Sequence, residues 1–309
     1  MCGLAASSLS IIIATKNRPA DLEKAIQSVL VQTRLPNELV LVDQSPERSF
    51  AKPINIPIRY IHDPGLSGAG TARNAGMDVA SGDIWLFLDD DVILEPDFIE
   101  KILAAYREGV TGVSGVVTSY SRPALGQLLW ETLFVRGPFL DDRQRVYWRA
   151  ERLKAAKPIR VRQFGAGLMS FRSCVIKQLR FDPNLAGASP GEDIDFCARL
   201  PRGSVLLITP RARLFHKRSP AGRNQAHWLL LHAQVNSYMR QRHWRSGIRN
   251  HLCFAWLNVG YALATSISVL RRGSLEPWRA WQEGLRRSAA TVGGKTQTNI
   301  PAPTVPGRS

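Results

Sequence analysis

The sequence has few cysteines and, beyond residue 200, almost no acidic residues. Its four cysteines include no CxxC pair and no zinc-ligand spacing, which argues against the common structural zinc modules. This sparse use of cysteine favours a reducing compartment, and we expect the cytoplasm. The amino end has no basic segment before a long apolar stretch, so we expect no secretory signal. The cysteines are Cys2, Cys174, Cys197 and Cys253, of which Cys197 and Cys253 are expected to be buried thiols.

The charge is distributed unevenly along the chain. Residues 1–199 contain 24 Lys and Arg against 23 Asp and Glu, a net charge of +1. Residues 200–309 contain 17 against 2, a net charge of +15 within the total of +16. With 309 residues, 44% of them hydrophobic, the chain can bury a substantial core. We therefore expect a charge-balanced domain followed by a basic region that meets a different partner.

Strand and helix patterns alternate in the first part of the chain. Short apolar runs predict strands, and apolar residues spaced by three or four predict helices. This alternation predicts an α/β domain with a mostly parallel sheet flanked by helices. The later stretch 121–160 has no clean period and is interpreted as an insertion or a mobile loop. The predicted strands are 9–14, 38–42, 56–61 and 84–88, and the predicted helices are 19–33 and 71–80.

The run WLFLDDD, residues 85–91, is the most informative segment. It is an apolar strand that ends in the three adjacent carboxylates of Asp89, Asp90 and Asp91. Adjacent negative charges repel one another, and a divalent cation with oxygen ligands would offset that repulsion. The alternative is a solvated acidic loop without a ligand.

Polar residues follow three of the predicted strands at their carboxyl ends. They are the turn from Thr15 to Arg18, then Asp43, then the acidic triplet. Ligands of open α/β sheets bind in the crevice outside these ends, so the pattern indicates a nucleotide-type site. The segment GAGTAR, residues 68–73, is a poor match to a dinucleotide fingerprint. Either Arg73 faces phosphate with the helix that begins there, or it is a surface residue.

Three further segments carry candidate chemistry. The glycine-punctuated strand at 164–172 would let a ligand approach the backbone. Glu192 and Asp193 begin a predicted helix, where a carboxylate is either an N-cap or a general base. His216 either makes an ordinary hydrogen bond or completes a metal shell. The basic loop that follows, residues 217–223, could close over a diphosphate.

Taken in order, these motifs resemble the family-2 glycosyltransferases of the GT-A fold, which is Rossmann-like. The resemblance runs from about Ser10 to Arg223. It implies a sugar-nucleotide donor, a bound Mg²⁺ or Mn²⁺, and hexosyl or deoxyhexosyl transfer with inversion. The QxxRW signature of processive synthases is absent, which favours transfer of one or a few sugars. The motifs are SIIIATKNR, LVDQS, GAGTARNAG, FLDDDVILEPDF, FGAGLMSFR, GEDIDFCARL and ARLFHKRSPAGR.

The resemblance also implies roles for single residues. The donor nucleotide would contact a set of residues that reaches from the first strand to the last loop. The metal would be held by Asp91 with Asp89 and His216, and Asp193 would be the base that activates the acceptor. The acceptor side would be lined by Gly165, Ala166, Gly167 and Glu192. The donor set comprises Thr15, Asn17, Arg18, Asp43, Arg73, Asp89, Asp90 and Arg223. Gln44, where many relatives carry Asp or Gly, departs from the family pattern, so the preferred base stays open.

The carboxyl-terminal part contains an uncharged run of 19 residues, 252–270, with Arg at both ends. This run predicts an interfacial helix or hairpin on an anionic membrane, with a membrane span and a soluble packing helix as alternatives. We expect a transferase domain over 1–225, a basic amphipathic helical region over 226–288 and a disordered tail over 289–309. Peripheral attachment to the cytoplasmic face of the plasma membrane would suit a glycan or lipid-linked acceptor in polysaccharide biosynthesis.

Three other functions compete with this interpretation. A sugar-nucleotide-forming nucleotidyltransferase would need a Gly-rich phosphate loop after the first strand, and ATKNR is not one. A nucleic-acid-binding protein could use the basic region, but its Arg residues interleave with a long apolar run, so we expect no nucleic-acid partner. An inactive relative would be expected to lack acidic motifs that are present here.

Overall fold

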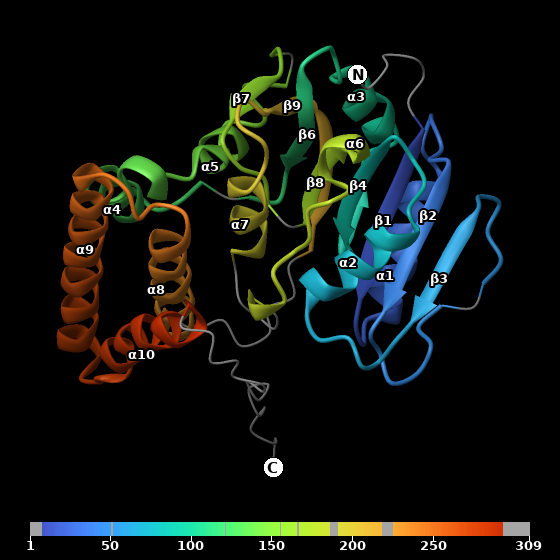
Figure 1. The fold of residues 1–309 in the computed structure, drawn as a ribbon. Coiled ribbons are helices and arrows are strands. Elements are labelled where there is room, and N and C mark those ends of the chain that lie inside the picture. Colours follow the sequence, from blue (N-terminus) through green and yellow to red (C-terminus); the bar gives the residue numbers. More distant parts are fainter. Residues whose placement is uncertain are drawn as a thin grey trace. The chain divides into compact units, whose positions relative to one another are not determined.

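A computed structural model describes residues 8–50, 52–120, 122–154, 156–165, 167–185, 191–217 and 225–292. The chain divides into two compact units, whose helices and strands are labelled in Figure 1. The sheet unit comprises Met1–Arg122, Asp141–Ala188 and Glu192–Ser219. The helical unit comprises Pro123–Leu140, Ser189–Gly191 and Pro220–Ser309.

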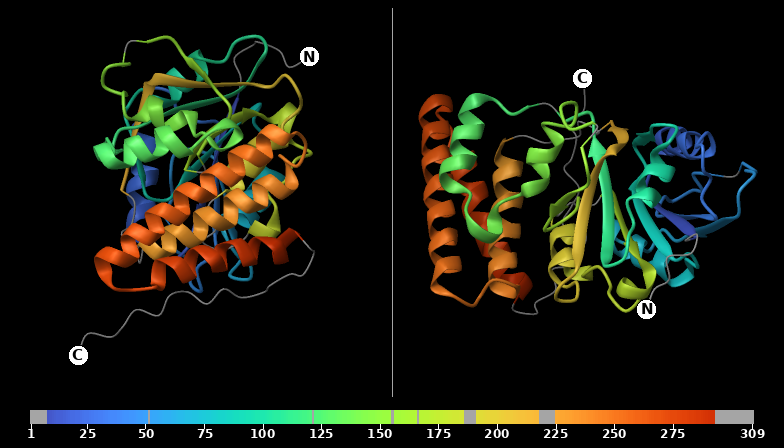
Figure 2. Two further views of the ribbon diagram at one scale, coloured as in Figure 1. Left: turned by 90° about the vertical axis from the view of Figure 1, so that its left-hand side faces the viewer. Right: turned by 90° about the horizontal axis from the view of Figure 1, so that it is seen from above.

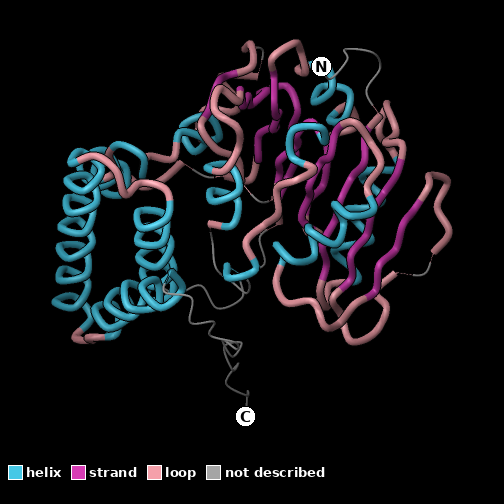
Figure 3. Tube along the Cα trace, viewed as in Figure 1, coloured by secondary structure: helices cyan, strands magenta, loops and turns pink. Residues whose placement is uncertain are grey.

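The sheet unit is built on a mixed sheet, whose strands are drawn in magenta in Figure 3. Its order is β3-β2-β1-β4-β8-β6-β9-β5, with β7 paired to β9. The first four strands in this order are parallel, as their sequence pattern predicted. The strands are β1 (Leu9–Thr15), β2 (Glu38–Asp43), β3 (Ile58–His62), β4 (Ile84–Asp89), β5 (Val92–Leu94), β6 (Val110–Val117), β7 (Ile159–Val161), β8 (Leu168–Arg172) and β9 (Val205–His216).

Helices of the sheet unit pack on this sheet and close its core. Helix α2 packs on β1 and β2, and α3 packs on β9. The expected α/β class is therefore confirmed, and every residue of β2 is buried, as expected for a strand covered on both faces. The helices are α1 (Pro19–Leu30), α2 (Ala69–Val79), α3 (Phe98–Ala104), α5 (Asp142–Tyr147), α6 (Ser173–Ile176) and α7 (Glu192–Ala198), with 3₁₀ turn η2 (Pro183–Leu185).

Antiparallel strands extend the sheet beyond β4 and bring later segments to its carboxyl end. β8 pairs antiparallel with β4 and places Leu168 opposite Leu88. β5 pairs antiparallel with β9 and places Val92 opposite His216. The acidic turn between β4 and β5 therefore lies beside the start of β8 and the end of β9.

The helical unit consists of α4 (Leu125–Phe134), η1 (Gly137–Phe139), α8 (Gln225–Arg242), α9 (Ile248–Arg272) and α10 (Glu276–Val292). Its core is formed by Phe139, Leu229, Leu257 and Tyr261. Figure 2 shows the long helices packed side by side, and α8, α9 and α10 contact one another. Within the described residues, α9 is the one helix long and apolar enough to cross a membrane by length and composition.

Several boundaries differ from the sequence interpretation. The stretch 123–140 belongs to the helical unit and forms α4 and η1, where we expected part of an insertion or mobile loop in the first domain. The fold of this stretch depends on aromatic contacts with α9, such as Trp130 with Tyr261 and Phe134 with Trp256. The periodicity of the stretch itself does not reveal these distant partners. Helix α10 ends at Val292, beyond the expected start of the tail at 289, and residues 293–309 lie outside the described ranges. Neither Cys197 nor Cys253 forms a disulfide, and of these two Cys197 is buried as expected whereas Cys253 is only partly buried.

Glu38 joins the amino end of β2 to two neighbouring segments. Its carboxylate accepts hydrogen bonds from Ser10 Oγ (2.6 Å), from the backbone N–H of Ser81 (2.6 Å) and from Arg59 Nε (2.8 Å). The side chain is only 6% exposed. Burial alone would raise the pKa of Glu38, but these hydrogen bonds outweigh it and lower the pKa from its ordinary 4.5 to about 2.

We expect Glu38→Gln to reduce the free energy of unfolding by about 3 kcal/mol near neutral pH, from the difference between the two pKa values. Because the folded-state pKa is lowered, this stabilisation is fully present above pH 4.5 and is lost as the pH falls toward about 2. Urea denaturation of wild type and Glu38→Gln, from neutral pH down to about pH 2, measures the difference in their free energies of unfolding. Glu23→Gln, at an exposed ion pair with Lys52, is the control. A gap between wild type and E38Q that does not narrow on acidification would contradict the assignment.

Candidate active site

The turn after β1 contacts the acidic turn after β4. Thr15 Oγ1 donates a hydrogen bond to Asp90 Oδ2 (2.7 Å). Arg18 Nη1 lies 3.3 Å from Asp90 Oδ1 and 3.6 Å from Asp91 Oδ2. Burial raises the pKa of Asp90, and the charges of Asp89 and Asp91 add to this shift while Thr15 and Arg18 oppose it. The acidic turn thus carries unfavourable like-charge interactions that Arg18 only partly offsets.

The loop after β2 is organised by Asp43, which is fully buried. One carboxylate oxygen accepts from the backbone N–H of Ser45 (2.9 Å), and the other accepts from Ser49 N (2.6 Å) and Tyr60 Oη (2.6 Å). These bonds lower the pKa of Asp43 although burial opposes them. Asp43 therefore holds its own loop in place, and its expected contact with a nucleoside stays a prediction.

Asn17 links the two loops. Its backbone N–H donates to Ser45 Oγ (2.8 Å), and its φ of 59° lies in the left-handed region, which Asn tolerates better than most residues. The turns at the ends of β1 and β2 are consequently held together, as their positions on neighbouring parallel strands predicted.

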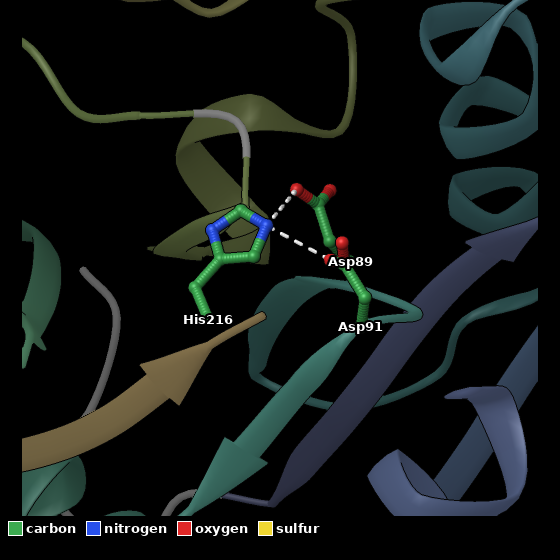
Figure 4. Close-up of side chains that lie close together, drawn as sticks. All are labelled: Asp89, Asp91 and His216. Carbon is green, nitrogen blue, oxygen red and sulfur yellow. Dashed lines mark ion pairs between the residues drawn. The ribbon is translucent and has the colours of Figure 1, made fainter. Parts of the chain in front are cut away.

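Asp89, Asp91 and His216 form a compact cluster, drawn in Figure 4. His216 Nε2 lies 2.8 Å from Asp91 Oδ1 and 3.7 Å from Asp89 Oδ2. One possible ligand atom from each residue lies within 4.8 Å of the others. The pairing of β5 with β9 produces this arrangement, and the backbone N–H of Lys217 donates to the Asp91 carbonyl (2.9 Å).

Gly167 lies directly against this cluster, in a place where no larger residue fits. A Cβ at position 167 would lie 2.5 Å from Asp89 Oδ2 and 3.2 Å from His216 Cε1. Any larger residue would therefore push against two of the three candidate ligands. Two carboxylates and one imidazole are ligands that suit Mn²⁺ and accept Mg²⁺. This set of three possible ligands fits a divalent cation.

Arg73 lies between the acidic turn and the start of α7. Its side chain is 2% exposed, Nη2 donates to Asp89 Oδ1 (2.9 Å), and Nη1 forms an ion pair with Glu192. The guanidinium also lies over the Phe181 ring, 5.6 Å from its centroid. In this structure Arg73 is not a surface residue but connects two carboxylates inside the sheet unit, and its expected contact with donor phosphate stays a prediction.

The amino end of α7 presents the second pair of acidic candidates. Glu192 and Asp193 are 7% and 8% exposed. Burial raises the pKa of Glu192 even though Arg73 opposes this shift. Asp193 Oδ1 accepts from the Ile194 backbone N–H (2.9 Å), and Oδ2 accepts from Arg143 Nη1 (3.1 Å). The carboxylate of Asp193 is thus held in a defined orientation.

Arg143 and Asp141 are residues that sequence reasoning missed. Arg143 Nε and Nη2 each donate to a different oxygen of Asp141 at 2.9 Å, a bidentate pair that leaves Nη1 for Asp193. A Cβ at Gly165 would lie 2.9 Å from Arg143 Nη1. The aperiodic stretch 121–160 carried no local signal for this contact. Of the other expected residues, Ala166 and Arg223 lie outside the described residues.

The family model for Glycosyl transferase family 2 matches residues 10–174, more than half of the chain. The chain belongs to glycosyltransferase family 2. The match covers β4, β5 and the acidic turn between them but not β9, which carries His216, and the family resemblance of the sequence is confirmed. The mixed sheet flanked by helices agrees with the GT-A-like fold expected for this family.

Known proteins similar to this family-2 chain include two curated relatives and a solved structure. An uncharacterised glycosyltransferase of Haemophilus influenzae is 36% identical over 97 residues, which cover 31% of this chain and 33% of that protein. The glucosyl-dolichyl phosphate glucuronosyltransferase of Haloferax volcanii is 28% identical over 114 residues, which cover 34% of this chain and 36% of that protein. The matches thus span about a third of these two relatives.

The solved structure is that of the mannosyltransferase PcManGT from Pyrobaculum calidifontis in complex with GDP-Man and Mn²⁺. It is 15% identical with a TM-score of 0.54, and the match covers 94% of this chain and 87% of that chain. At this identity the likeness concerns the fold.

Proposed function

We propose that this chain is a metal-dependent, inverting glycosyltransferase that moves a sugar from a nucleotide-sugar donor to a hydroxyl of a glycan or lipid-linked acceptor. The observation that carries the proposal is the cluster of Asp89, Asp91 and His216 at the carboxyl end of the parallel strands in a family-2 chain. Ligands of open α/β sheets bind at this edge.

The donor would occupy the edge formed by the turns after β1, β2 and β4. Asp89, Asp91 and His216 would hold Mn²⁺ or Mg²⁺, which when bound supplies positive charge for the departing diphosphate. Arg73 would keep Asp89 in position through its buried ion pair. Arg18, whose side chain is 41% exposed, is the described arginine best placed to meet donor phosphate beside the acidic turn.

Asp193 would take the proton of the acceptor hydroxyl. As the acceptor oxygen bonds to the anomeric carbon, the bond from that carbon to the diphosphate oxygen breaks, and the nucleoside diphosphate leaves. Arg143 and the Ile194 backbone N–H hold Asp193 at the amino end of α7. Attack opposite the leaving group inverts the anomeric centre.

Two of the similar proteins support the choice of substrates. The solved mannosyltransferase holds GDP-Man and Mn²⁺, and the Haloferax relative is named for glucuronosyl transfer on a glucosyl-dolichyl phosphate. A nucleotide-sugar donor and a lipid-linked acceptor are therefore the first substrates to test with this chain.

A thermal-shift screen of UDP-, GDP- and dTDP-sugars with and without Mn²⁺ tests the proposal. We expect one donor to raise the melting temperature only when Mn²⁺ is present, because ligand that binds only the folded chain stabilises it.

Gly167→Ala should weaken Mn²⁺ binding about 10- to 100-fold, since its Cβ displaces Asp89. Gly126→Ala is the matched control, because a Cβ there meets nothing within 4 Å. Equal donor binding in the presence of a chelator would contradict the metal's role.

The helical unit supports a location at the cytoplasmic face of the plasma membrane, as a peripheral protein. It contains 13 Lys and Arg against 3 Asp and Glu, a net charge of +10. Such a charge is attracted by anionic lipid headgroups. A lipid-linked acceptor would be presented at the same surface.

A further inference from the structure

An apolar row lies on the exposed side of α4. Leu125, Leu129 and Leu133 are spaced by four residues, so they occupy one side of the helix. Their exposed fractions are 71%, 61% and 53%. Exposing such apolar side chains to water is unfavourable. Three of them on one side of a helix form an apolar row that is typical of an interaction surface.

A longer apolar row lies on α9. Its members recur at intervals of three or four residues, and each is at least 44% exposed. The opposite side of α9 is buried, with Leu257 at 1%, Tyr261 at 3% and Thr265 at 0% exposure. Helix α9 therefore has apolar residues on both sides, since Leu257 and Tyr261 pack in the core of the helical unit while a second apolar row faces outward along its length. The row consists of Ile248, Leu252, Trp256, Val259, Leu263, Ile267 and Leu270.

Specific contacts join the two helices. Trp256 Nε1 donates to the Leu133 carbonyl (2.8 Å), and Trp130 Nε1 donates to the Gly260 carbonyl (3.0 Å). Gly260 permits this approach, because a Cβ there would overlap the Phe134 ring. Leu133 and Trp256 each belong to an exposed row, so the rows meet on one surface. Figures 1 and 2 show α4 lying alongside α9. We call the ten residues of the two rows the α4–α9 face.

The positive charges around the α4–α9 face favour an anionic bilayer as its partner. Arg245 and Arg249 are exposed at one end of α9, and Arg271 is exposed at the other. With a net charge of +10 on the helical unit, two copies would repel each other, whereas an anionic bilayer would attract the arginines and accept the apolar rows. Trp256 at the centre has the amphipathic ring that is enriched at membrane interfaces.

The packing of α9 determines how it meets the bilayer. Thr265 and Ser268 are 0% and 6% exposed on its inner side, and α9 contacts α4, α8 and α10. A helix crossing the hydrocarbon would have to lose these contacts. A helix lying in the headgroup region keeps them and buries only its outer row.

We propose that the α4–α9 face docks the protein on an anionic bilayer, with both rows inserted at the level of the headgroups and the flanking arginines on lipid phosphates. The proposal rests on the membrane location given above and names the surface responsible. The new element is α4: a helix far from α9 in the sequence supplies three of the ten anchoring side chains.

Flotation of the full chain with vesicles of phosphatidylglycerol and phosphatidylcholine tests this surface. We expect Leu129→Asp and Leu263→Asp each to lower the apparent association constant for vesicles at least about tenfold, since each removes a leucine that would insert into the bilayer and adds a charge that the anionic lipids repel. Val31→Asp in the sheet unit is the matched control, because Val31 is 63% exposed and Leu129 is 61% exposed. Lipids brominated at a shallow depth should quench tryptophan fluorescence more strongly in wild type than in Trp256→Phe, because the chain has eight tryptophans, and high salt should weaken binding.

Distinct results would overturn the proposal. Binding that depends on Leu263 but not on Leu129 would assign anchoring to α9 alone. Resistance to alkaline carbonate extraction would indicate a membrane span, and dimers that L129D dissociates, without vesicle binding, would indicate a second copy as the partner. The donor-dependent thermal shift of the L129D L263D variant should equal that of wild type. If wild type bound vesicles but showed no donor-dependent thermal shift, the transferase function would be rejected, and the membrane docking of the α4–α9 face would still stand.

Discussion

Asp91→Asn should reduce transfer by about 10²- to 10³-fold or more, with the fold intact. Asp91 Oδ1 lies 2.8 Å from His216 Nε2, and Asn keeps the shape of the side chain while losing the charge that a divalent cation requires. The measurement is release of nucleoside diphosphate over a range of Mn²⁺ concentrations. The thermal shift caused by donor with Mn²⁺ should disappear together with turnover.

Asp78→Asn is the control for this variant, because Asp78 forms a surface ion pair with Arg180 and lies outside the cluster. Its turnover and Mn²⁺ response should match those of wild type. An Asp91→Asn protein that turns over at the wild-type rate with the same Mn²⁺ dependence would remove Asp91 from the metal site.

Asp193→Asn should lower kcat about 10²- to 10⁴-fold, the usual contribution of a general base. In contrast to Asp91→Asn, donor affinity and the Mn²⁺-dependent thermal shift should persist, since Asp193 is assigned to the acceptor. Arg143 keeps its bidentate pair with Asp141 in this variant, so the buried guanidinium retains a carboxylate partner. Steady-state kinetics with donor titration separates the two effects.

Asp142→Asn is the matched control for Asp193→Asn, because Asp142 pairs with Arg162 at the surface of the same unit. It should leave kcat unchanged. If Asp193→Asn instead weakened donor binding and spared kcat, Asp193 would be a donor-binding residue, and the base would have to be sought elsewhere.

Much of the donor edge could be predicted from the sequence because it is local. A β-branched apolar run such as 9–14 predicts a buried strand, and polar residues directly after parallel strands must gather at one edge. Thr15, Asn17 and Asp90 are brought together in this way. The acidic triplet was recognised as a candidate cation site for the same reason, since charge repulsion between neighbouring carboxylates follows from composition alone.

The side-chain partners within that edge could not be predicted. Asp43 and Arg73 have the residue types of donor ligands, yet Asp43 is bonded by its own loop and Arg73 is enclosed by Asp89 and Glu192. A sequence pattern specifies which side chains approach the edge, but burial and competition between partners decide which of them remain accessible.

The sequence by itself determined the α/β class and the contrast between a balanced and a basic part, because these follow from periodicity and composition, and its ordered motifs carried the resemblance to the family. The family resemblance implied that His216 joins Asp91, and the tertiary structure supplied the strand pairing that does so. The tertiary structure alone decided that Arg143 holds Asp193 and that α4 joins α9 in one exposed apolar face. Each of these contacts connects residues far apart in the chain. They depend on strand register and helix packing, which local sequence does not encode.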